Sequence, residues 1–115
     1  MNTETEALAF RAIACPAWRW LPGMLYRQGA AENRPIIATA PIIRGGGLPD
    51  LSDPATLGAL LALVREAFGD PTLFAECHPI GARWQTHSVD GGIFGEGNSE
   101  AAALVAALEA ASPAP

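Results

Sequence analysis

Two cysteines and two histidines are the side chains of this sequence best suited to metal binding or nucleophilic chemistry: Cys15, Cys77, His78 and His87. Zinc sites are recognised by short spacings such as C-x-x-C and H-x3-H, which are missing here. Cys77 and His78 are adjacent, so on a strand their side chains point to opposite faces and cannot pair for catalysis. We therefore expect no metal, no cofactor, no catalytic residue and no enzyme activity, with both cysteines as free thiols in the core.

A glycine-rich segment at residues 44–47 resembles a phosphate-binding loop only superficially. Arg44 is followed by three glycines, and a predicted helix begins a few residues later. A phosphate loop requires the lysine of G-x-x-x-x-G-K-[ST], and this chain contains no lysine. Asp50 and Asp53 lie at the start of the predicted helix and would repel phosphate. We interpret the segment as a flexible connector.

A set of aromatic and arginine residues gives the strongest indication of function. Tryptophan, tyrosine and arginine dominate the hot spots of protein interfaces, and the same residue types can stack on a base while holding a phosphate. Tryptophan is also highly buried on average, so the sequence leaves open whether these rings belong to the core or to the surface. The predicted binding residues are Trp18, Arg19, Trp20, Tyr26, Arg27 and Arg34, with Arg44, Arg83 and Trp84 as further members.

The clearest helix signal runs from Pro54 to Phe68. Ser52 or Asp53 can cap its first turn, and Gly69 is suited to cap its last. Leucine and valine recur along one face at helical spacing, which predicts an amphipathic helix with its apolar face in the core. Gly58 lies inside this helix, where it costs about 1 kcal/mol relative to alanine. We therefore expect another backbone to approach Gly58 closely.

Two further helices are predicted near the ends of the chain. Residues 3–15 begin with the capping-box spacing Thr3-x-x-Glu6 and end before a proline. Residues 99–111 are rich in alanine and leucine, and Asn98 or Ser99 can cap the start of this helix.

Strand-favouring residues separate these helices, and the connections between the strands are short. Short connections favour hairpins, so we predict one α+β domain over residues 1–111, with an antiparallel sheet of about five strands and helices packed on its faces in the order α-β-β-α-β-β-β-α. Pro41 cannot donate to a central ladder, so it places the second strand at an edge of the sheet or beside a bulge. Residues 112–115 are expected to be a frayed tail. The predicted strands lie near residues 24–28, 35–43, 72–77, 83–89 and 93–95.

Charge and composition exclude several functional classes. The net charge of −5 over 115 residues argues against nonspecific nucleic-acid binding, which requires a basic surface. Residues 1–47 carry a net charge of +2 and residues 48–115 carry −7, so the charge is distributed unevenly along the chain. No apolar run reaches the roughly 20 residues that span a bilayer, and the acidic N-terminal segment does not resemble a secretion signal. We expect a cytoplasmic protein that does not associate with membranes.

Three sequence blocks resemble a group of short phage and prophage proteins without an assigned activity. The blocks are PDLSDPATLGALLALVREAFGDP at residues 49–71, EGNSEAAALVAALEAA at 96–111 and WRWLPGM at 18–24. Because they consist mainly of helices and caps, the resemblance implies a fold and a phage origin, and it transfers no catalytic residue. Small acidic phage proteins often bind host machinery, including defence systems.

The resemblance and the missing catalytic motifs together give a functional expectation. We expect a non-enzymatic phage accessory protein that acts in the cytoplasm of the host cell by binding a host protein, in the manner of an anti-CRISPR inhibitor of host defence. The alternative is an oligomeric sponge that sequesters a nucleotide immune signal in a pocket built from the tryptophan and arginine residues. A homo-oligomer is compatible with both.

Overall fold

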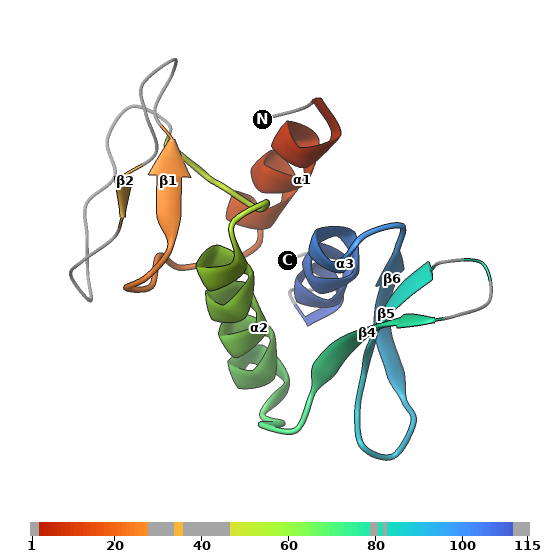
Figure 1. Ribbon diagram of the computed structural model, residues 1–115. Helices are drawn as coiled ribbons and strands as arrows, with labels where there is room; N and C mark the ends of the chain where they lie inside the picture. Colours follow the sequence, from red (N-terminus) through yellow and green to blue (C-terminus); the bar gives the residue numbers. More distant parts are fainter. Residues whose placement is uncertain (1–2, 28–33, 36–46, 79–80, 82, 112–115) are drawn as a thin grey trace.

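The computed structural model describes residues 3–27, 34–35, 47–78, 81 and 83–111, and for Arg34 and Pro35 it describes the backbone alone. Three helices and two groups of short strands alternate along the chain (Figure 1). The elements are α1 (Thr3–Ile13), β1 (Leu25–Arg27), β2 (Arg34–Pro35), β3 (Leu48–Pro49), α2 (Pro54–Phe68), β4 (Phe74–His78), β5 (Arg83–His87), β6 (Ile93–Gly97) and α3 (Glu100–Ala111).

The strands form two separate antiparallel sheets. Sheet A has the order β2-β1-β3, and sheet B has the order β4-β5-β6. The predicted α+β class with antiparallel pairing is confirmed, and the strands divide between two sheets because the helices lie between them (Figure 1). The two-residue strand β3 adds one element to the predicted order, since Leu48 pairs with Arg27 of β1. The predicted edge strand at residues 35–43, including Pro41, lies outside the described residues except for Pro35.

Helix α3 lies at the centre of the described fold. It packs on β6 and β5 of sheet B, and it also contacts α1 and α2 (Figure 1). Its leucine and valine side chains, Leu104, Val105 and Leu108, are fully buried in a hydrophobic cluster that also contains residues of α1 and α2. None of the helices in the described part of the chain is long and apolar enough to cross a membrane.

Helix α2 begins and ends at the predicted residues. The Asp53 carboxylate accepts a hydrogen bond from the backbone N–H of Thr56 at 2.9 Å, which satisfies a free donor of the first turn. At the other end, Gly69 adopts the left-handed conformation with φ of 65°, where a residue without Cβ is favoured. These two caps explain why local sequence determined the bounds of this helix.

Close approach of backbones occurs at Gly95 and Gly97 in β6. A Cβ atom on Gly95 would lie 2.4 Å from the carbonyl oxygen of Ala103, and one on Gly97 would lie 2.4 Å from the Cβ of Ala102. Glycine is therefore required where α3 crosses β6. The expectation for Gly58 is wrong, because Gly58 is exposed on α2 and no atom lies within 4 Å of a Cβ placed there.

The two cysteines occupy different environments. Cys15 is buried, as predicted, whereas Cys77 is exposed, so the expectation of two core thiols is wrong for Cys77. Cys77 pairs with Trp84 across sheet B. Helix α3 packs chiefly on β6 and β5 and covers the edge strand β4 less, which leaves Cys77 open to solvent although it lies in the predicted strand.

Candidate functional site

Three aromatic rings of the predicted set form a continuous series beside sheet A. Trp18 and Trp20 lie between α1 and β1, and their ring centroids are 5.3 Å apart at an interplanar angle of 85°. Trp20 and Tyr26 of β1 are 6.1 Å apart at 75°. Both contacts have the edge-to-face geometry that aromatic pairs prefer. All three rings are half-buried against the hydrophobic cluster, so each belongs partly to the core and partly to the surface.

The indole N–H of Trp18 is a buried donor for which the described part of the chain provides no hydrogen-bond acceptor. A buried, unsatisfied polar group costs roughly 1–3 kcal/mol, so native structures usually pair such groups. The aromatic series therefore contains a local energetic cost that the neighbouring ring contacts must offset.

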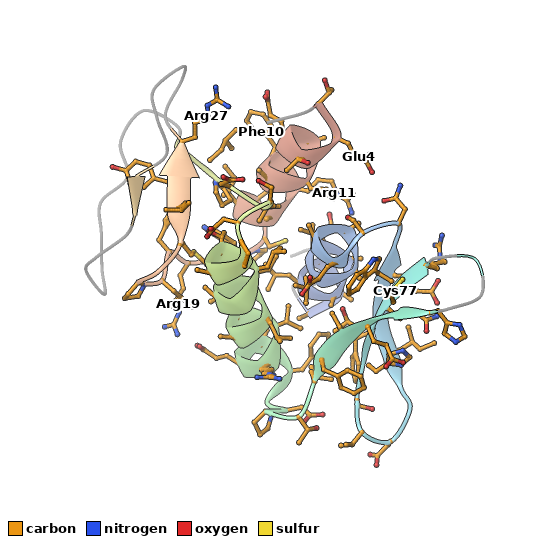
Figure 2. The ribbon with its side chains drawn as sticks, viewed as in Figure 1. Glu4, Phe10, Arg11, Arg19, Arg27 and Cys77 are labelled. Carbon is orange, nitrogen blue, oxygen red and sulfur yellow. The ribbon has the colours of Figure 1, made fainter. Side chains whose placement is uncertain are left out.

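The exposed Arg19 of this region forms an ion pair with helix α2. The Arg19 guanidinium donates to the Glu66 carboxylate of α2, and the two side chains are 58% and 60% exposed. Figure 2 shows Arg19 and Arg27 projecting from opposite ends of the region. The side chain of Arg34 is not described, and Arg44 lies outside the described residues.

Arg83 and Trp84 do not join the aromatic series. Both lie in β5 of sheet B, which α2 and α3 separate from sheet A (Figure 1). The Arg83 Nε donates to the Glu96 carboxylate of β6 at 3.3 Å. Trp84 shares the helix-covered face of the sheet with Thr86, whose hydroxyl donates to the Ala103 carbonyl of α3 at 3.0 Å. The structure thus divides the predicted set between two regions.

Trp84 lines a pocket that sequence reasoning missed. The pocket has a volume of about 440 Å³ and is lined by both apolar and polar side chains, including two carboxylates. Its residues come from four separate segments of the chain, so no local motif marks it. The lining consists of Glu4, Thr5, Leu8, Leu51, Leu57, Trp84, Asn98, Ser99, Glu100 and Ala101.

The cysteines and histidines are not arranged as a catalytic group. His87 stacks on Phe74 with centroids 5.7 Å apart, and its Nε2 lies 3.5 Å from the Glu76 carboxylate. Burial raises the pKa of the Cys15 thiol, which disfavours the reactive thiolate. Across the described ranges, no three side chains of the metal-ligating types gather into a group that could hold an ion.

Comparison with known proteins adds no relative: no family model, curated protein or solved structure matches this chain. The phage resemblance of the three sequence blocks therefore remains a prediction.

Proposed function

We propose that this chain is a non-enzymatic accessory protein that binds a host protein through the aromatic series Trp18, Trp20 and Tyr26 together with Arg19. One observation carries the proposal: three half-buried rings in edge-to-face contact lie beside an arginine that is 58% exposed. Tryptophan, tyrosine and arginine are the residues that contribute most to interface hot spots. Inhibition of a host defence system is the specific form of this proposal.

The arrangement of charges favours a protein partner over a nucleotide. Arg19 and Arg83 each bind a carboxylate of this chain, and Glu66 and Glu96 would compete with a phosphate for them. The two arginines also lie in different sheet regions, so they cannot clamp one small anion within a single copy. An exposed ion pair contributes at most about 1 kcal/mol, so a protein partner can replace Glu66 as the acceptor of Arg19 at little cost.

A matched pair of variants tests this proposal. The tagged protein, Arg19→Ala and Arg83→Ala serve as baits in host lysate, and retained proteins are quantified by mass spectrometry. Arg83 is the control because it is 57% exposed and also forms one ion pair with a glutamate. We expect a host protein that wild type and Arg83→Ala retain and that Arg19→Ala retains about tenfold less, as for loss of a hot-spot arginine.

Two outcomes contradict the proposal. The first is that no host protein is reproducibly enriched while a small molecule co-purifies with the wild-type chain. The second is that both arginine variants lose the same protein equally, which would move the interface away from the aromatic series.

A further inference from the structure

The pocket beside Trp84 has the volume of a small-molecule site, and apolar and polar residues share its lining equally. Its volume of about 440 Å³ falls within the range of roughly 300–1,000 Å³ that is typical of ligand pockets. Leu8 and Leu51, which are 6% and 2% exposed, form part of its wall together with Leu57 and the Trp84 ring. Ligand pockets commonly combine such an apolar wall with a few polar groups that orient the ligand.

Close packing in sheet B holds two walls of this pocket together. Trp84 pairs with Gly97 across the sheet, and Gly97 lies directly against Ala102 in the first turn of α3. The start of α3 is therefore fixed beside Trp84, with Ser99 and Glu100 in the pocket wall. The Ser99 hydroxyl caps this turn by accepting from the Ala102 N–H at 3.1 Å.

Charge decides which ligand the pocket fits. Glu4 and Glu100 contribute two negative charges, and among the described residues no lining side chain is basic. Helices α1 and α3 both begin at the pocket, and each helix start is equivalent to about +0.5 charge, so the two carboxylates outweigh them. Glu4 lies at the start of α1, on the side of the molecule where β6 leads into α3 (Figure 2). A net charge of about −1 remains and favours a monocation.

We propose that this pocket binds a small organic ammonium ion with an apolar body. Trp84 lines the pocket and is the residue type best suited to cation–π contact, the carboxylates of Glu4 and Glu100 balance the charge, and the leucines contact the apolar body. Trp18, Trp20 and Tyr26 do not line the pocket, so this proposal does not rest on the proposed protein interface.

Titration with choline tests the proposal against an uncharged isostere in which a tert-butyl group replaces the trimethylammonium group. The readouts are calorimetry and the indole N–H resonance of Trp84. We expect choline to shift this resonance and the isostere to bind at least about tenfold more weakly, since it lacks both cation–π and charge contacts. Glu4→Gln and Glu100→Gln should each weaken choline binding about fivefold, as for loss of one exposed charge partner.

Glu6→Gln is the matched control, because Glu6 is exposed in the same first turn of α1 but does not line the pocket. It should leave choline affinity unchanged. The proposal is overturned if choline does not bind, if the uncharged isostere binds equally well, or if Glu6→Gln weakens binding as much as Glu4→Gln. A shift of the same indole resonance by inorganic phosphate would also overturn it, because it would assign the pocket to anions.

Discussion

Sheet B with α3 and sheet A with the aromatic series are held together in different ways. Helix α3 lies directly against the backbone of β6 at Gly95 and Gly97. Because glycine has no side chain, the helix and the sheet pack closer together there than any other residue would allow. The strands of sheet A are only two or three residues long, and the Leu25 N–H of β1 donates a hydrogen bond to the Thr56 hydroxyl of α2.

This difference matters for function. Backbone contact leaves no side chain that can move, whereas half-buried rings can change rotamer when a partner approaches. The rigid region therefore supplies a fixed wall of the pocket, through Trp84 and the start of α3, and the aromatic region suits an adaptable interface.

Gly95→Ala should have the largest effect. The new Cβ would lie 2.4 Å from the Ala103 carbonyl oxygen and 2.5 Å from the Ala107 nitrogen, and neither backbone atom can move alone. Overpacking of this kind costs about 3 kcal/mol or more when backbones must shift. Urea unfolding followed by circular dichroism measures the loss. An unchanged midpoint would contradict backbone contact as the basis of this region.

Thr56→Val should weaken the link between sheet A and α2. The Thr56 hydroxyl accepts from the Leu25 N–H at 2.8 Å and donates to the Asp53 carboxylate at 2.9 Å. Valine keeps the shape but leaves the Leu25 N–H unsatisfied, so we expect a loss of roughly 1–3 kcal/mol. Hydrogen exchange should accelerate at Leu25.

Thr86→Val is the control for this link, because Thr86 donates its hydroxyl to the Ala103 carbonyl within the rigid region. It should not accelerate exchange at Leu25. Faster exchange at Leu25 in both variants would mean that the two regions open together and are not separately held.

Gly58→Ala should stabilise the protein slightly. Gly58 is exposed in α2, and a Cβ there meets no atom within 4 Å. Alanine restricts the unfolded chain more than glycine does, so we expect a gain of about 0.5–1 kcal/mol in the free energy of unfolding. The same urea titration that detects the loss in Gly95→Ala measures this gain. A loss of stability would reveal a close approach at Gly58.

Replacing Asp70 should have the smallest effect, and this effect should appear in the pH dependence of the protein's stability. The Thr72 hydroxyl and N–H donate to its carboxylate at 2.6 and 2.9 Å, and these bonds lower the pKa of Asp70 from its ordinary value of 3.8. Because the folded pKa is the lower one, the carboxylate stabilises the fold above the unfolded pKa and loses this contribution as pH falls through the folded pKa.

Thermal unfolding between about pH 7 and pH 2 measures this dependence. Asp70→Asn should remove a small part of the acid-side loss of stability, because asparagine does not titrate. An identical profile for the variant and the wild type would show that the turn between α2 and β4 contributes nothing to it.

The sequence by itself determined the helices and the strand pairing of sheet B. Capping residues, a proline at the start and a glycine at the end act within a few residues of one another, so the bounds of α2 matched the structure. Short hairpins likewise made β4, β5 and β6 readable as an antiparallel meander.

Only the tertiary structure decided which residues meet. It separated Arg83 and Trp84 from the aromatic series, exposed Cys77, and required glycine at Gly95 instead of at Gly58. It also assembled the pocket from four segments far apart in the chain. Periodicity and capping are local, whereas the placement of α3 between sheet B and the other helices depends on packing over the whole described fold.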